Sequence, residues 1–260
     1  MATVIDVPTQ KGGSCKTTTV LEVAGEAARS GMRVLIIDLD PQGSLSDLLG
    51  IEHERSATVF DVLAGYVEAS DAVQRWERKG VGLDVLAANE NLAYVGNLIQ
   101  DDFGALKRAI ADLCLVKPYD LIMIDGAPMP QTVLAFNALF ASDWVLLPTR
   151  ASRQYVQSLL RSARTIEKFA AANDGKPVIE GVVLCDHSAH IANSKHWEGV
   201  ATLYCRKKGI VMHDRIRHSS AVEDAQTEGL PVVLGNRGRP VARDYRCFCA
   251  ELFARVGLGA

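Results

Sequence analysis

Short apolar segments alternate along this chain with longer stretches of helical period. The apolar segments predict buried strands over residues 3–7, 34–38, 83–87, 121–125, 144–148, 178–184 and 210–213. A spacing near 3.6 predicts helices over residues 17–29, 103–116, 154–172 and 196–207. Strands that are apolar throughout and separated by helices favour a mostly parallel sheet with helices on both faces. We therefore expect a single α/β domain over residues 1–260.

Residues 50–80 break this alternation. The stretch is polar and irregular, with a short helical piece at residues 59–65. We expect it to form an excursion from the sheet.

Charged residues stand where three of the predicted strands end. Asp38 and Asp40 close the second strand, Asp125 closes the strand at residues 121–125, and a lysine- and glycine-rich run follows the first strand. Parallel α/β sheets bind ligands at the carboxyl ends of their strands. We expect these strand ends to converge on one site.

The run at residues 11–19 has the composition of a phosphate-binding loop that opens a helix. A helix N-terminus offers an anion unpaired N–H groups and the positive end of the helix dipole. Gly12 and Gly13 permit close approach of the backbone and positive φ. Lys16 is predicted to reach the β and γ phosphates of a nucleoside triphosphate, and the Thr17 hydroxyl to join a Mg²⁺ shell. The predicted nucleotide-binding residues of the loop are Lys11, Gly12, Gly13, Ser14, Cys15, Lys16, Thr17 and Thr18.

The strict pattern G-x-x-x-x-G-K-[ST] requires glycine where this chain has Gln10 and Cys15. With the additional Lys11, the run K-G-G-x-x-K-T-T resembles the deviant Walker A loop of the ParA/MinD ATPases. The resemblance implies a P-loop NTPase-like fold, ATP and Mg²⁺ as cofactors, and a homodimer formed on ATP binding. In that dimer Lys11 crosses to the partner's nucleotide and acts with Lys16 in catalysis. Taken alone, the run is also compatible with a turn that holds no ligand.

Residues 38–43 are similar to the family's D-x-D-P-Q-G motif. The resemblance implies that Asp40 orients or deprotonates the attacking water and that Asp38 lies near the metal shell. D-P-x-G is also a common turn, so a turn without chemistry is the alternative.

Residues 119–128 resemble the family's Walker B strand, which implies that Asp125 holds a Mg²⁺-bound water. Gly126 and Ala127 stand where that pattern has threonine and proline, and this pair is less constrained. We expect nucleotide binding to survive this departure better than tight control of hydrolysis.

The family places adenine between the loops that follow the strands at residues 178–184 and 210–213. This implies that Asp186 and Asp214 contact the base, although both loops depart from the usual residues. A carboxylate there is compatible with adenine or guanine, and the resemblance alone favours ATP.

The family's carboxyl-terminal region supplies arginines that hold DNA without sequence preference. Carried over by position, the candidates are Arg215, Arg217, Arg243 and Arg246. The net charge of −3 argues against a nucleic-acid protein, but residues 201–260 contain ten basic and six acidic side chains. The alternative is a solvated, arginine-rich surface.

The composition is that of an ordinary globular protein, with 48% hydrophobic and 23% charged residues. No apolar run approaches a membrane span and no secretory signal is present, so we expect a cytoplasmic protein, nucleoid-associated if the resemblance holds. The six cysteines show no C-x-x-C spacing and are expected to be free thiols; Cys247 and Cys249 make a poor metal pair. Cys15, between Lys11 and Lys16 at a helix N-terminus, is expected to favour its thiolate and to be sensitive to oxidants.

The function implied by the resemblance is that of a ParA partition ATPase of the short type, without a preceding helix-turn-helix domain. ATP makes the dimer, the dimer coats DNA, and a ParB-like centromere-binding partner stimulates hydrolysis. One alternative is a MinD-like membrane-associated ATPase, but residues 245–256 contain Glu251 and predict a docked terminal helix. The other is a metabolic enzyme on the same fold, such as an iron–sulfur reductase component or an ATP-dependent ligase.

Overall fold

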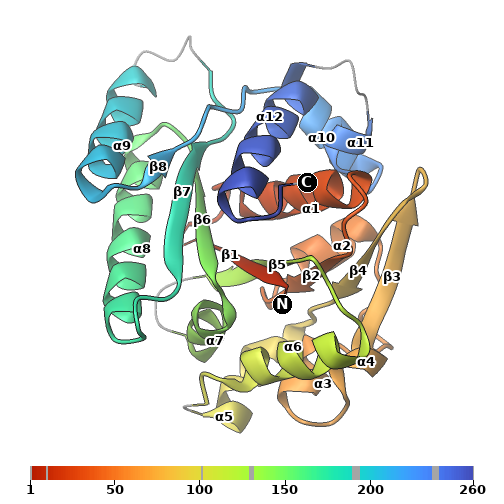
Figure 1. The fold of residues 1–260 in the computed structure, drawn as a ribbon. Coiled ribbons are helices and arrows are strands. Elements are labelled where there is room, and N and C mark those ends of the chain that lie inside the picture. The colour runs from red at the N-terminus through yellow and green to blue at the C-terminus, as the bar shows by residue number, and fades with distance from the viewer. Residues whose placement is uncertain are drawn as a thin grey trace.

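An eight-stranded sheet forms the centre of the computed structural model, which describes residues 2–9, 11–100, 102–128, 132–188, 194–235 and 240–259 (Figure 1). The strands are β1 (Thr3–Thr9), β2 (Val34–Asp38), β3 (Val73–Arg78), β4 (Val81–Leu86), β5 (Leu121–Pro128), β6 (Trp144–Thr149), β7 (Val178–Leu184) and β8 (Val211–Met212). Their order in the sheet is β3-β4-β2-β5-β1-β6-β7-β8. Neighbours are parallel except for the antiparallel pair β3 and β4. The prediction of a single, mostly parallel α/β domain is confirmed.

Helices cover both faces of this sheet (Figure 1). One face carries α1 (Lys16–Arg29), α2 (Ser44–Leu49), α10 (Ser220–Thr227), α11 (Val232–Gly235) and α12 (Pro240–Arg255). The other carries α3 (Val59–Leu63), α4 (Ala69–Ala72), η1 (Glu90–Tyr94), α5 (Gly96–Ile99), α6 (Ala105–Val116), α7 (Val133–Ala141), α8 (Arg153–Ala171) and α9 (Ser194–Lys208). Alternate side chains of the central strands enter the two apolar layers: on β1, Ile5 and Val7 face α1, and Val4 faces the opposite layer.

The prediction that residues 50–80 form an excursion from the sheet is wrong in one respect. Residues 59–63 form the predicted helical piece as α3, but Val73–Arg78 form β3, an edge strand of the sheet. Only Trp76 of β3 is buried, at 2% exposure, because the other side chains point outward or lie at the sheet edge. An edge strand of this kind contains no apolar run, so the hydrophobic pattern did not predict a strand there.

The carboxyl-terminal helices are anchored on α1 by a buried carboxyl group. Glu22 of α1 is fully buried and accepts hydrogen bonds from the backbone N–H groups of Val232 (2.6 Å) and Val233 (3.1 Å). These are first-turn N–H groups of α11, which have no partner within the helix. Gly25, one turn later on α1, permits the close approach, since a Cβ there would lie 2.5 Å from a Pro231 carbon.

The terminal helix α12 is docked, as predicted. It buries Tyr245, Phe248, Leu252 and Phe253 against α1 and the sheet, while Cys247 is exposed and Cys249 buried. All six cysteines are free, as expected. Within the described ranges, no helix is both long and apolar enough to cross a membrane.

The burial of Glu22 predicts a pH dependence of stability. Burial raises the pKa of Glu22 from 4.5 to about 8. The unfolded chain therefore ionises this group at lower pH than the folded protein, so its contribution is complete below pH 4.5 and is lost as the pH rises toward 8. Glu22→Gln should lessen the fall in unfolding free energy across this window, by at most about 1.4 kcal/mol per pH unit. Urea denaturation at several pH values measures the difference, and parallel curves for the two proteins would contradict it.

Candidate functional site

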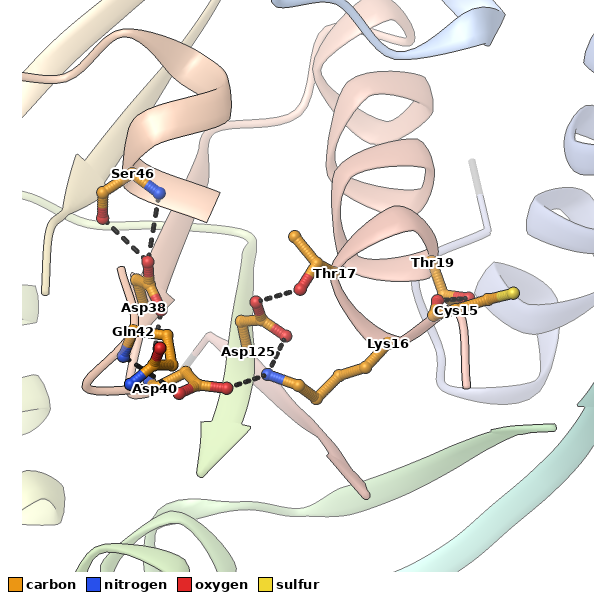
Figure 2. A network of polar contacts seen from close by, with 9 residues as sticks. All are labelled: Cys15, Lys16, Thr17, Thr19, Asp38, Asp40, Gln42, Ser46 and Asp125. Atoms are coloured by element: carbon orange, nitrogen blue, oxygen red, sulfur yellow. Dashed lines mark hydrogen bonds and ion pairs between the residues drawn. The ribbon is translucent and has the colours of Figure 1, made fainter. Parts of the chain in front are cut away.

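The three strand ends singled out from the sequence converge, as expected. β5 lies between β1 and β2 in the sheet, so the loop after β1 and the carboxylates at the ends of β2 and β5 meet at one edge. Figure 2 shows Lys16, Thr17, Asp38, Asp40 and Asp125 around the N-terminus of α1.

Lys16 is the cation at the centre of this group. Its Nζ lies 2.8 Å from Asp125 Oδ1 and 3.3 Å from Asp40 Oδ2 (Figure 2). Burial by itself would lower the pKa of Lys16, but the two carboxylates outweigh burial and raise it. Lys16 is therefore charged, and it is positioned at the helix N-terminus that the phosphate-loop interpretation requires.

Thr17 and Asp125 together suit a magnesium ion. The Thr17 hydroxyl donates a 2.8 Å hydrogen bond to Asp125 Oδ2, so two hard oxygen donors are adjacent. Asp125 is fully buried, and burial raises its pKa although Lys16 opposes the shift. Mg²⁺ in nucleotide sites keeps several waters and uses phosphate oxygens, so it needs few ligands from the protein.

Asp38 organises the loop that carries Asp40. Its Oδ2 accepts hydrogen bonds from the Ser46 backbone N–H (3.0 Å) and hydroxyl (2.8 Å), and its Oδ1 accepts one from the Asp40 N–H (3.2 Å). Asp40 Oδ1 accepts a hydrogen bond from the Gln42 N–H (3.1 Å), which orients this carboxylate. The structure thus gives Asp38 a positioning contact, and its place in a metal shell stays a prediction.

An additional carboxyl group, that of Asp6, was not expected. It lies on β1 and is 1% exposed, and neither of its oxygens has a hydrogen-bond partner in the described part of the chain. Burial raises the pKa of Asp6 to about 8, although Lys16 opposes the shift. Gly126 makes room for this carboxyl group: a Cβ on Gly126 would lie 2.4 Å from Asp6 Oδ1. The glycine that departs from the family pattern is therefore a steric requirement of Asp6.

The phosphate loop has left-handed backbone at two positions. Gly13 has φ 77°, and Cys15, directly before α1, has φ 68°. Of the two predicted glycines only Gly13 has the positive φ, and a Cβ there would lie 3.0 Å from the Tyr155 hydroxyl. A side chain in the left-handed region costs about 1 kcal/mol, so Cys15 is strained where the strict pattern has glycine. Gln10, the other departure, lies outside the described residues.

The Cys15 thiol is activated, but by groups other than those expected. A hydrogen bond with Cys185 is the largest influence that lowers the pKa of Cys15; burial opposes it, and Arg150 adds to it. Lys16 instead binds carboxylates, and Lys11 donates a 2.7 Å hydrogen bond to Gln154 Oε1. The direction of the prediction is thus confirmed and its cause corrected.

Lys11 lies against α8. Besides its bond to Gln154, its Nζ stands 5.5 Å from the centre of the Tyr155 ring. This contact is exposed.

A cavity of about 100 Å³ adjoins the loop, and Asp186 but not Asp214 lines it. Its wall includes Cys15, Thr18, Arg150, Asp186, Arg217 and Gln226. Asp186 pairs with Arg150 (3.1 Å) and His218 (2.6 Å). Asp214 is exposed, and the structure does not bring it to this cavity.

The four candidate DNA-binding arginines differ in their surroundings. Arg217 lines the cavity, and its guanidinium donates two hydrogen bonds to Asp244, of 2.6 and 2.9 Å. Arg246 is partly buried and donates to the Val233 carbonyl (3.0 Å). Arg215 and Arg243 are exposed side chains, and Arg215 lies 3.4 Å from Glu198.

The sequence analysis did not select two charged residues of the site, although the sequence contains an indication of each. Asp6 is a carboxylate inside an otherwise apolar predicted strand. Arg150 directly follows β6, so the strand-end argument that selected Asp38 and Asp125 applied to it as well.

The contact between Asp6 and Gly126 predicts an energetic coupling. Gly126→Ala should destabilise the fold by about 1 to 3 kcal/mol, because the new methyl group overlaps Asp6. Asp6→Ala removes the obstruction, so the double variant should recover most of that loss. Urea denaturation of the four proteins gives the coupling free energy, and additive effects would show that the two residues are independent.

Known proteins resemble this chain over most of its length. A family model described as an AAA domain matches residues 2–176. The chromosome partitioning protein ParA of Caulobacter vibrioides is 33% identical over 258 residues, covering 97% of this chain and 94% of that protein.

Solved structures share the fold. The Cyanothece McdA(D38A)–ATP complex superimposes with a TM-score of 0.85 at 21% identity and covers 100% of this chain and 98% of that one. Cobyrinic acid a,c-diamide synthase from Mycobacterium smegmatis, with bound ATP analogue and magnesium, has a TM-score of 0.81 at 28% identity and covers 97% and 95%. The phosphate loop with its additional lysine, the converging carboxylates and this full-length similarity agree: the chain belongs to the ParA family of P-loop ATPases within the ParA/MinD superfamily.

Proposed function

We propose that this protein is a ParA-type partition ATPase that dimerises on ATP, holds duplex DNA without sequence preference, and positions DNA with a ParB-like partner in the cytoplasm, on the nucleoid. The observation that carries the proposal is the convergence of Lys16, Thr17, Asp40 and Asp125 on a loop that also contains Lys11. Family membership supports ATP with Mg²⁺ as the cofactors.

The residues of the site have distinct tasks in ATP binding. Lys16 exchanges its contacts with Asp40 and Asp125 for phosphate oxygens. Thr17 and Asp125 would then hold Mg²⁺, which would neutralise charge on the phosphates. Release from Lys16 leaves the Asp40 carboxylate, oriented by Gln42, able to accept a hydrogen bond from the attacking water.

Lys11 is suited to reach a second subunit. Its hydrogen bond to Gln154 is exposed to solvent, and such a bond contributes only about 1 kcal/mol. Exchange of this contact for the phosphates of a partner's nucleotide is therefore favourable in free energy. Formation of the dimer would depend on ATP, because the triphosphate is what Lys11 binds.

The candidate DNA surface lies where the segment after β8 meets α12. Arg217 links this segment to α12 through hydrogen bonds to Asp244. The exposed Arg215 lies on the segment two residues before Arg217, and the exposed Arg243 lies on α12 directly before Asp244. Phosphate contacts require only positive charge within reach, so these two arginines are our candidates for binding duplex DNA.

A MinD-like membrane role is the alternative, and the structure favours it less. An interfacial helix needs an exposed apolar face, whereas α12 buries Tyr245, Phe248, Leu252 and Phe253 in the main core. Sedimentation with anionic liposomes, with and without ATP, separates the two functions.

The DNA role predicts ATP-dependent, salt-sensitive binding to random-sequence duplex DNA. Each phosphate contact contributes about −0.9 to the slope of log affinity against log salt, so Arg215→Ala should weaken binding and make that slope shallower by about 0.9. Lys11→Ala should lose DNA binding while a single subunit still binds ATP. Fluorescence anisotropy at several salt concentrations measures both effects.

Arg78→Ala is the matched control for Arg215→Ala. Arg78 is exposed and lies on β3, at the opposite edge of the sheet from β8. The Arg78→Ala variant should bind DNA with the same affinity and the same salt slope as the native protein. DNA binding of equal affinity with and without ATP, or no DNA binding at low salt, would contradict the proposed DNA role.

The proposed task of Asp40 predicts a separation of binding from turnover. Asp40→Ala should slow ATP hydrolysis by about 10²- to 10⁴-fold, the usual contribution of a group that handles a proton in the transition state. ATP should still bind, since Lys16, Thr17 and Asp125 remain. Single-turnover hydrolysis and equilibrium binding of a fluorescent ATP analogue test this. An unchanged hydrolysis rate would show that a residue other than Asp40 acts on the attacking water.

A further inference from the structure

Two cysteines from distant parts of the chain meet beside the phosphate loop. Cys15 ends the loop before α1, and Cys185 directly follows β7. A hydrogen bond between the two side chains lowers the pKa of Cys15 and raises that of Cys185. Thr19 holds the pair from one side: its hydroxyl donates to the Cys15 carbonyl (2.8 Å) and stands 3.7 Å from Cys185 Sγ.

One cysteine of the pair lines the cavity that adjoins the loop. Cys15 lines this cavity together with Thr18, Arg150 and Asp186, and Cys185 immediately precedes Asp186. Cys15 is partly exposed, whereas Cys185 is 1% exposed. A small oxidant can therefore reach Cys15, and Cys185 is in place to react with the product.

We propose that Cys15 and Cys185 form a reversible disulfide that closes the nucleotide site under oxidising conditions. The oxidant is a peroxide. Cys15 sulfur attacks one peroxide oxygen, the O–O bond breaks, and a sulfenic acid and water result. Cys185 sulfur then attacks the Cys15 sulfur, which forms the S–S bond and releases a second water, so two thiols together supply the two electrons that peroxide takes up.

The disulfide acts on the loop through backbone geometry. It confines the Cα atoms of the two cysteines to a narrow range of separations and ties the last loop residue to the end of β7. Cys15 already has the left-handed backbone, with φ 68°, so the loop has little freedom to compensate. The tie opposes any shift of the loop's backbone N–H groups toward a phosphate.

This inference rests on the proposed position of the nucleotide, and its test separates the two. The full chain is treated with hydrogen peroxide, blocked with an alkylating agent, and analysed by mass spectrometry of non-reduced peptides. A fluorescent ATP analogue is then titrated into the reduced and oxidised protein. We expect a peptide that links Cys15 to Cys185 and an affinity lower by about tenfold, within the usual range for coupled sites. Dithiothreitol should restore the affinity.

Three variants complete the experiment. Cys185→Ser and Cys15→Gly should each bind the analogue equally well before and after peroxide, relative to their own reduced forms. Cys15→Gly also relieves the left-handed strain, so it provides a folded comparison if loss of the buried Cys185 thiol destabilises the protein. Cys247→Ser, which removes the exposed thiol of α12, should respond as the native protein does.

Three results would overturn the proposal: no linked peptide in the native protein, a linked peptide without loss of affinity, or equal loss of affinity in Cys185→Ser. If the reduced protein fails to bind the ATP analogue, the proposed function is at fault. The linked peptide then still decides whether the two cysteines react.

Discussion

The ammonium group of Lys16, buried among carboxylates at the carboxyl edge of the sheet, is the interaction on which the site depends. Asp125 and Asp40 contact it directly, and its positive charge also lowers the pKa values of Asp6 and Asp38, against the effect of burial. One cation does not compensate this many acidic groups, and burial accordingly raises the pKa values of Asp6, Asp38 and Asp125. Such a site favours a ligand that brings a cation for the carboxylates and an anion for the lysine at once, as a magnesium nucleotide does.

The pair Asp6 and Gly126 shows how a departure from a family pattern can be compensated within one fold. Gly126 occupies the place of a threonine in the Walker B pattern, and the sequence alone presents it as a loss of constraint. In the structure the missing side chain is what admits the Asp6 carboxyl group beside Gly126 of the neighbouring strand β5. The consequence is an additional ionisable group near Asp125, and burial raises the pKa of this group to about 8.

The helix α1 connects the phosphate loop to the carboxyl-terminal region. Its first turn contacts α10 through a 2.9 Å hydrogen bond from Gln226 to the Thr18 hydroxyl, and its middle holds α11 through Glu22. The segments that carry the candidate DNA-binding arginines are therefore packed, by way of these helices, on the element that begins with Lys16. A displacement of the loop on nucleotide binding would act directly on these contacts.

The sequence by itself determined the α/β sheet, the positions of most strands and helices, and the meeting of Lys16, Thr17, Asp38, Asp40 and Asp125, because apolar periodicity and strand ends are local properties of the chain. It did not reveal β3, whose exposed side chains form no apolar run. Only the tertiary structure decided which residues become neighbours across the fold. It placed Cys15 beside Cys185, Lys11 on α8, Arg217 on Asp244 and Asp6 against Gly126, and left Asp214 outside the cavity. These contacts join residues from separate elements, and they depend on how the layers pack, which local sequence does not specify.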